Sequence, residues 1–236
     1  MNESENTRAA APRSPTRATK RDAVEVMRST TEYLIATFQA ERALKAGNCA
    51  PLFRLRDQRG AELASETLLR RGPVLLAFYS GSWCAPCNRD LKIFERLRPD
   101  VEARGATFVS ISQQTVAENL KAHQLLKLRF PILSDRGARL AEQFGLRWRV
   151  PKPLRDIHRR SKIDLPVLDG DERWTFPIPA RFILDRAGVI VYSEVNPGHS
   201  SPSSARDVLP VLDHLRGPYG TRFGASLRGT ASARQS

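Results

Sequence analysis

The feature that most constrains the fold is a buried strand that runs directly into a pair of cysteines. Residues 73–80, PVLLAFYS, form a continuous apolar run, which is typical of a strand buried on both faces. A short turn, SGSW, follows, and the pattern becomes helical from Cys84 to Leu97. We expect this helix to end at Pro99 and Gly105, so the two cysteines lie at its first turn.

The remaining patterns predict a single large domain with appendages. An amphipathic helix is expected over 22–46, and the domain itself over 47–216. A hairpin around DQRG, strands over 106–112 and 130–135, and a last hairpin joined by RAG predict a central mixed sheet flanked by helices. Thr115 to Glu118 is a candidate capping box, and Ser204 is a candidate cap for a last helix. Residues 147–177 show no clear period and are expected to form an irregular insertion.

The net charge of +13 is concentrated at the two ends of the chain. Residues 1–21 carry five basic and two acidic side chains, and residues 214–236 carry four arginines and no acid, so together they supply +7. Both ends are rich in Ala, Ser, Thr and Gly and are expected to be disordered, as tails over 1–21 and 217–236. No segment has the length or apolarity of a membrane span or a secretory signal.

The cysteine pair has three interpretations. Structural zinc needs four ligands, but the chain has no second pair, and its four histidines lack ligand spacing, so no metal or other cofactor is expected. An inert buried pair is also disfavoured, because a helix N-terminus stabilises a thiolate. Reversible redox chemistry between Cys84 and Cys87 is the favoured interpretation, and Pro86 suits the first turn of such a helix.

Several motifs along the chain resemble the alkyl hydroperoxide reductase/thiol-specific antioxidant class of peroxiredoxin-like proteins, within the thioredoxin-fold superfamily. They are APLFRLRDQRG, GPVLLAFYSGSWCAPC, VSISQQ, FPILSD, AEQFGL and PIPARFILDRAGVI. The resemblance implies an α/β thioredoxin-like fold with an N-terminal helix and an insertion before the last hairpin. It also implies that Cys84 and Cys87 are the redox pair and that Trp83 is the aromatic residue preceding it.

The resemblance further implies that Pro179 corresponds to the cis-proline that faces the cysteines in thioredoxins. Position by position, however, the chain departs from typical peroxiredoxins. In their frame Cys87 is the peroxide-attacking cysteine, Cys84 replaces a threonine, Pro179 replaces an arginine and Ser80 a proline. Arg181 is close in sequence to the missing arginine. Ala77 stands where thioredoxins carry a buried aspartate.

The function implied is reduction of hydroperoxides with electrons from a thioredoxin-like dithiol. A disulfide oxidoreductase with little peroxidase activity is the alternative, as is a redox-sensing or nucleic-acid-binding module that uses the basic tails. The sparse cysteines favour a reducing, cytoplasmic location. A homodimer is left open, nucleic acid is a disfavoured partner, and no membrane is expected.

Two further features have competing interpretations. Cys49 is expected to be a small buried residue rather than a resolving thiol. The run over 147–162 carries seven basic residues and one acid. It is interpreted as a solvated face beside the active site in preference to a binding surface for an acidic partner or nucleic acid.

Overall fold

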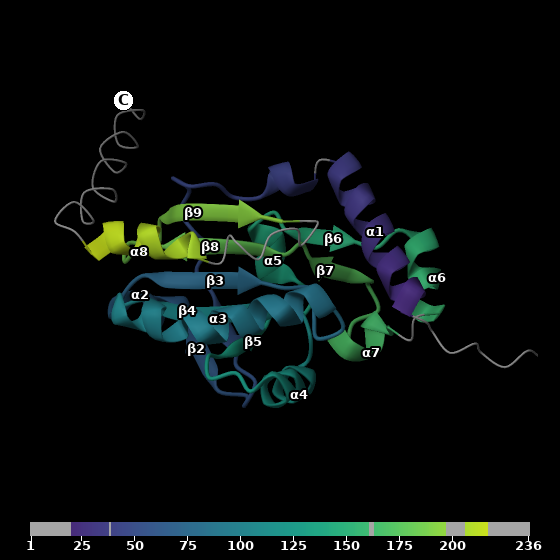
Figure 1. Cartoon of the computed structure of the whole chain (residues 1–236), viewed down its shortest axis with the longest axis horizontal. Helices are drawn as coiled ribbons and strands as arrows, with labels where there is room; N and C mark the ends of the chain where they lie inside the picture. Colours follow the sequence, from purple (N-terminus) through teal and green to yellow (C-terminus); the bar gives the residue numbers. More distant parts are fainter. Residues whose placement is uncertain (1–19, 38, 161–162, 197–205, 217–236) are drawn as a thin grey trace, which may run out of the picture.

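The structure is a computed structural model that describes residues 20–37, 39–160, 163–196 and 206–216 (Figure 1). Its helices and strands follow the order expected for the redox domain. In chain order they are α1 (Lys20–Ala36), η1 (Gln39–Arg42), β1 (Arg54–Arg56), β2 (Glu62–Ala64), α2 (Ser65–Arg71), β3 (Val74–Phe78), α3 (Ala85–Ala103), β4 (Thr107–Ser112), α4 (Val116–Leu126), β5 (Ile132–Ser134), α5 (Arg139–Gln143), β6 (Arg147–Arg149), α6 (Lys152–Arg160), α7 (Leu165–Asp169), β7 (Thr175–Pro177), β8 (Ala180–Leu184), β9 (Ile190–Val195) and α8 (Val208–Arg216).

A seven-stranded mixed sheet forms the centre of the molecule, in the order β2-β1-β5-β4-β3-β8-β9. Strands β3, β4 and β5 run parallel, whereas β1 with β2 and β8 with β9 form antiparallel hairpins. The predicted mixed sheet with helices on both faces is therefore confirmed. Because β3 is central and every one of its residues is buried, its sequence is continuously apolar rather than alternating.

Alternate residues of β3 point to opposite faces of the sheet and pack in two separate hydrophobic cores. Leu75 and Ala77 pack on one face with residues of α3, α4 and α8, while Leu76 and Phe78 pack on the other with residues of α2 and α5. Figure 1 shows α3 and α8 in front of the sheet and α5 behind it. The two cores hold β3 rigidly, so the loop that leaves its carboxyl end has a fixed starting point.

Two helix boundaries differ from the expected ones. The first helix ends at Ala36 rather than near residue 46, and a short 3-10 helix follows. The chain turns there because Leu44 donates a backbone hydrogen bond to the Phe144 carbonyl, at 3.1 Å, which draws residues 42–44 onto the body of the domain. Helix α3 continues through Pro99 to Ala103, since an exposed proline in its last turns removes only one intrahelical bond.

Contrary to expectation, the described residues of the 147–177 insertion, 147–160 and 163–177, form regular helices and strands. It contains β6, α6, α7 and β7, with β6 and β7 paired antiparallel as a separate small sheet. Trp148, Trp174 and Phe176 form a third core with Leu34 of α1. Figure 1 shows α1 and α6 lying together beside this sheet, at one end of the molecule. An N-terminal helix and an insertion more than a hundred residues later thus stabilise one another.

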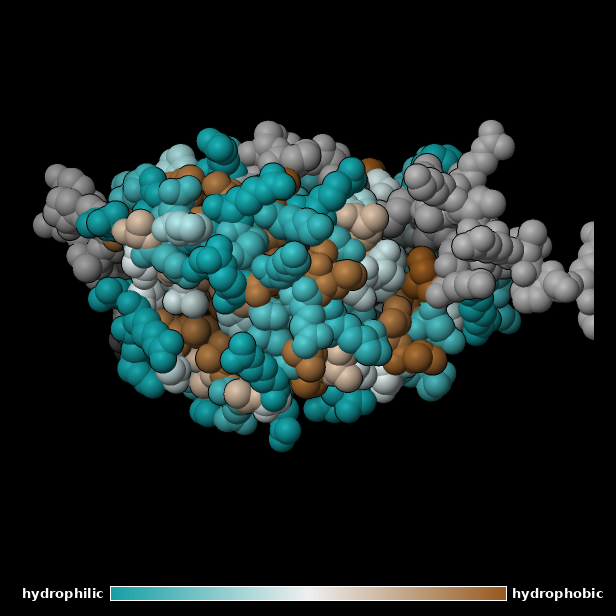
Figure 2. Space-filling view, turned by 60° about the horizontal axis from the view of Figure 1, so that its bottom comes forward, coloured by the Kyte–Doolittle hydropathy of each residue, from teal (hydrophilic) through white to brown (hydrophobic). Residues whose placement is uncertain are grey.

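The ends of the chain are not part of this description. The predicted tails, apart from Lys20 and Arg21, and the candidate cap at Ser204 lie outside the described residues. Figure 2 shows one face on which polar side chains predominate and hydrophobic ones form separate small patches. In the described parts of the chain, no helix is both long and apolar enough to cross a membrane.

Candidate active site

The two cysteines lie at the start of α3, just after the loop that connects it to β3, as the sequence predicts. Cys84 is the N-cap of α3, and its sulfur accepts a hydrogen bond from the backbone N–H of Cys87, at 3.2 Å. Pro86 lies in the first turn, where a missing N–H has no partner to lose. Cys84 and Cys87 form a disulfide with their Cα atoms 5.3 Å apart. Both are buried, with exposed fractions of 1% and 2%, so Cys84 is not the more exposed of the two in this oxidised state.

The turn before the cysteines is held by side chains that the sequence analysis did not identify. The side-chain oxygen of Gln114 accepts the Ser82 N–H at 2.7 Å, and its nitrogen donates to the Ser82 hydroxyl at 3.1 Å. The Asn88 amide donates to the Ser82 carbonyl at 2.7 Å. Gln114 follows β4, the parallel neighbour of β3, and such strand ends meet at one edge of a sheet. The position of Gln114 directly after a buried strand is the sequence feature that could have indicated this role.

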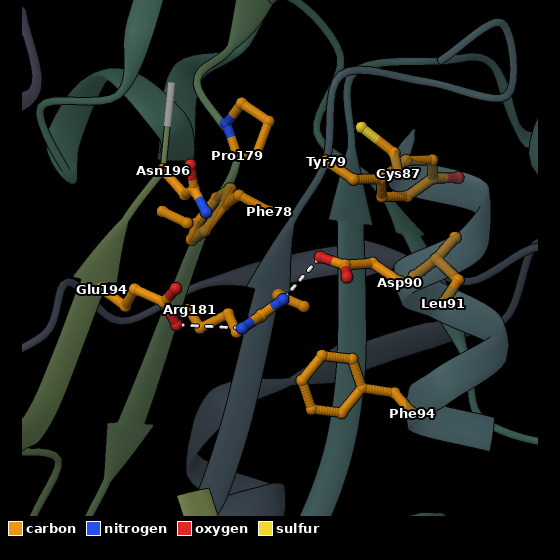
Figure 3. A pocket seen from close by; sticks show the side chains of 12 residues that line it. Phe78, Tyr79, Cys87, Asp90, Leu91, Phe94, Pro179, Arg181, Glu194 and Asn196 are labelled. Atoms are coloured by element: carbon orange, nitrogen blue, oxygen red, sulfur yellow. Dashed lines mark hydrogen bonds and ion pairs between the residues drawn. The ribbon is translucent and has the colours of Figure 1, made fainter. Parts of the chain in front are cut away.

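Cys87 lines a narrow pocket between α3 and β8. Figure 3 shows Cys87 and Tyr79 on one side of this pocket and Pro179 and Asn196 on the other. The Tyr79 hydroxyl donates to the Asn119 side chain at 3.3 Å, and burial raises the pKa of Tyr79 well above its usual value. Tyr79 therefore remains neutral, and it is one of the residues that line the pocket.

Arg181 reaches into the same pocket from β8 and is 6% exposed. Its two terminal nitrogens contact Asp90 of α3, at 2.5 Å, and Glu194 of β9, at 2.9 Å, as the dashed lines in Figure 3 show. Its guanidinium also lies 5.0 Å from the centre of the Phe94 ring. Three predicted site residues, Cys87, Pro179 and Arg181, are thus brought together around one pocket, which Cys84 does not line.

Trp83 closes the opposite side of the cysteine turn. Its ring packs edge-to-face on His158 of α6, with ring centres 5.2 Å apart, and on Phe176 of β7, at 5.5 Å. His158 is fully buried, and burial lowers its pKa to about 4, so the ring is neutral at physiological pH. His158 carried no recognisable spacing in the sequence, because its neighbours come from distant segments.

The predicted cis peptide at Pro179 is wrong. Among the described residues no peptide bond is cis, and Ile178–Pro179 is trans. Pro179 continues the extended chain between β7 and β8, and its carbonyl accepts the Asn196 N–H at 2.9 Å, next to the end of β9. The correspondence with the thioredoxin cis-proline is therefore withdrawn, although Pro179 does line the Cys87 pocket.

The expectation for Cys49 is also wrong, because its side chain is exposed. Cys49 forms an isolated bridge with Val189, just before β9. The β3–β8 register pairs Phe78 with Ala180 at the end of the sheet near the cysteine pair, and Val74 with Leu184 at the other end. Cys49 therefore lies at the far end of the sheet from Cys84. The backbone of Cys49 is held there by pairing with the β8–β9 hairpin, and its side chain does not pack in the core.

No cluster of three or more His, Cys, Asp or Glu side chains able to hold a metal ion occurs within the part of the chain that the structure describes. The groups at this site that can take part in chemistry include the Cys84 and Cys87 sulfurs and the Arg181 guanidinium.

A buried carboxyl ties the insertion to the strand end near the active site and predicts a pH-dependent stability. Asp169 is 1% exposed, accepts a hydrogen bond from the Gln113 amide, and has a pKa that burial raises to about 8. Between about pH 4 and 8 the folded state holds a proton that the unfolded state has lost, so the free energy of unfolding falls as the pH rises. At pH 6.5 about half of the unfolded-state His158 is still protonated, but its remaining titration up to pH 8.5 opposes the fall by only about 0.4 kcal/mol.

We expect the oxidised protein to lose about 1–2 kcal/mol of unfolding free energy between pH 6.5 and 8.5, since one linked proton is worth at most about 1.4 kcal/mol per pH unit. Urea unfolding at several pH values measures this. Asp169→Asn should remove most of the fall, while the exposed Glu172→Gln should not. An unchanged pH profile in Asp169→Asn would show that the carboxyl is ionised in the folded protein.

Comparison with known proteins identifies the family to which the chain belongs. The AhpC/TSA family matches residues 46–193. A Mycobacterium tuberculosis protein named as a peroxiredoxin is 28% identical over 142 residues, covering 60% of this chain and 90% of that protein. The thiol-disulfide oxidoreductase ResA of Geobacillus thermodenitrificans is 29% identical over 110 residues, covering 46% of this chain and 62% of its own.

Solved structures agree with the fold described above. The crystal structure of peroxidoxin BcpB from Mycobacterium tuberculosis superposes with a TM-score of 0.60 at 23% identity, covering 74% of this chain and 99% of that one. Xanthomonas campestris peroxiredoxin Q superposes with a TM-score of 0.55 at 16% identity, covering 70% and 92%. Since the family match spans more than half of the chain, the protein belongs to the AhpC/TSA family and is a thiol-dependent oxidoreductase of the peroxiredoxin type.

Proposed function

We propose that Cys87 attacks hydroperoxides and that Cys84 resolves the product. The observation that carries this assignment is that Cys87, and not Cys84, lines the pocket that Arg181 enters. The positive guanidinium lines the same pocket as Cys87, where it pairs with Asp90 and Glu194. A thiolate and a peroxide oxygen both gain from such a charge.

The proposed cycle balances with two thiols and one peroxide. The Cys87 thiolate attacks one peroxide oxygen, the O–O bond breaks, and the alkoxide leaves and takes up a proton as an alcohol, or as water when the substrate is hydrogen peroxide. The Cys84 sulfur then attacks the resulting Cys87 sulfenic acid, releasing water and forming the Cys84–Cys87 disulfide. An external dithiol restores both thiols by exchange and is itself oxidised.

Exchange with protein disulfides is assigned to Cys84, whose thiolate attacks the partner disulfide and forms a mixed disulfide, which Cys87 then breaks. When a dithiol donor reduces the oxidised pair, the donor thiolate attacks the Cys84 sulfur and the Cys87 thiolate leaves. The Cys84 sulfur accepts the Cys87 N–H at the start of α3, an interaction that favours its thiolate form. A thioredoxin-like protein is the proposed electron donor, and the cytoplasm the proposed location, because thiols there are kept reduced. The same feature supports the second candidate function, a disulfide oxidoreductase with little peroxidase activity.

We expect hydrogen peroxide to oxidise the pair measurably, but well below the rate of a dedicated peroxiredoxin. Cys84 replaces the typical threonine and Pro179 the typical arginine, so both of these side-chain donors are missing, and Arg181, which lines the Cys87 pocket, is the candidate substitute. Removing one positioned donor typically costs roughly 10²–10³ in rate. Stopped-flow fluorescence of the reduced protein, with hydrogen peroxide and separately with a small disulfide, measures the two activities side by side.

Two results would contradict this expectation in opposite directions. Oxidation near the diffusion limit would mean that Arg181 fully replaces the missing donors. Oxidation no faster than that of a free thiol, with rapid disulfide exchange, would leave the disulfide oxidoreductase as the function.

A further inference from the structure

A groove on the insertion side of the molecule is lined by four arginines from three segments of the chain. The arginine groove is lined by Arg42 of η1, Arg147 and Arg149 of β6, and Arg173, which precedes β7, together with Tyr33 of α1 and Glu142 of α5. Its volume is about 690 Å³, within the range of small-molecule sites. Four arginines and one glutamate give its lining a net charge of +3.

The arginines of the groove divide into paired and unpaired ones. Arg147 contacts Glu142, and Arg173 contacts Asp171 at 2.7 Å. Within the described parts of the chain, Arg42 and Arg149 have no carboxylate partner. Two guanidiniums that face one cavity without a counter-charge are suited to an anion that carries two charges, which their planar forks can bind through several N–H donors.

The fold fixes the positions of these two residues independently of any ligand. Gly145, with a φ of +73°, allows close approach of the Arg42 backbone, because a Cβ there would lie 2.1 Å from the Arg42 carbonyl oxygen. On the other wall, Arg149 is held by the β6–β7 ladder opposite Thr175. The backbone on both walls of the groove is thus fixed before a ligand binds.

We propose that the arginine groove binds a small phosphate monoester with an apolar or aromatic body. The dianionic phosphate would lie between Arg42 and Arg149. The Tyr33 ring, 43% exposed and packed on Trp148 with ring centres 5.8 Å apart, offers a face for the body of the ligand. An extended polyanion fits less well, because the carboxylate of Glu142 lies in the lining and that of Asp171 pairs with a lining arginine.

Isothermal titration calorimetry with phenyl phosphate tests the proposal, with phenol and inorganic phosphate as separate probes at constant ionic strength. Phenyl phosphate should bind at one site, and more tightly than phenol or inorganic phosphate alone. Arg42→Gln and Arg149→Gln should each weaken binding roughly tenfold to a hundredfold, because each removes charge-assisted hydrogen bonds. Arg96→Gln, an equally exposed arginine on α3, should leave the affinity unchanged.

Equal weakening by all three variants would show a diffuse charge effect and overturn the site. Binding of a single-stranded oligonucleotide or a glutamate-rich peptide, with no saturable binding of phenyl phosphate, would also overturn it, in favour of a macromolecular surface. Arg42 and Arg149 are both exposed and form no ion pair with another described residue, so their substitution should not disturb folding, which thermal unfolding of each variant checks.

Discussion

Replacing Cys87 with serine is expected to reduce peroxide turnover to the uncatalysed rate, because the hydroxyl of serine is a far weaker nucleophile than a thiolate at neutral pH. Cys84→Ser should behave differently. It should consume about one equivalent of peroxide per chain, accumulate a sulfenic acid at Cys87, and stop, since no second thiol lies within reach. Stopped-flow oxidation followed by mass spectrometry of a sulfenic-acid adduct distinguishes the two variants.

Cys49→Ser is the matched control, because Cys49 lies at the far end of the sheet and should have no effect on turnover. The same variants also test the roles in disulfide exchange. If Cys84→Ser still forms mixed disulfides rapidly while Cys87→Ser does not, the proposed order of attack is reversed. A disulfide between Cys49 and either active-site cysteine in the oxidised wild type would overturn the pairing itself.

The parts of the fold that the sequence predicted are those encoded by local patterns. The apolar run of β3 and the RAG turn between β8 and β9 each specify their own conformation, and both appear as expected. The cap at Thr115 was half right. Its hydroxyl accepts the Glu118 N–H at 3.3 Å, but its own N–H donates to the Leu168 carbonyl instead of to Glu118.

The parts that the sequence could not predict depend on contacts between distant segments. The insertion looked irregular because its helices and strands are short, and their stability comes from aromatic side chains packed under α1. The hydrogen bonds of Gln114 and Asn88 to the cysteine turn could not be predicted, because they form only when the end of β4 and the start of α3 are folded against that turn. The hydrogen bond between the Pro179 carbonyl and the Asn196 N–H likewise joins residues that no local pattern connects.

Arg181 illustrates both sides of this division. Sequence comparison placed it near a missing arginine, two residues away from the expected position. The β3–β8 register sets it opposite Ala77, where thioredoxins carry a buried aspartate, and directs its guanidinium toward Asp90 on α3. The small side chain at position 77 leaves room on this face of the sheet for the arginine. This chain thus has an alanine at the position of the buried aspartate of thioredoxins, and the buried charge on this face of the sheet is the guanidinium of Arg181.

Arg181→Met is accordingly expected to have a large effect on both stability and activity. It keeps much of the side-chain volume but leaves Asp90 and Glu194 facing each other without a cation. Removing one partner of a buried ion pair costs about 3–5 kcal/mol, and because both carboxylates are partly exposed we expect about 3 kcal/mol. Urea unfolding measures this. Arg54→Met, which breaks a pair exposed by 61% and 58%, should cost less than about 1 kcal/mol.

The activity of Arg181→Met separates a catalytic role from a structural one. If the guanidinium polarises the peroxide, oxidation by hydrogen peroxide should slow by roughly 10²–10³, the usual cost of one positioned donor. Exchange of Cys84 with a small disulfide should change much less, because Arg181 lines the pocket of Cys87 and not that of Cys84. Arg181→Lys keeps the positive charge and should recover part of the peroxide rate. An equal slowing of both reactions in Arg181→Met would instead mean that Arg181 only holds α3 against the sheet through Asp90.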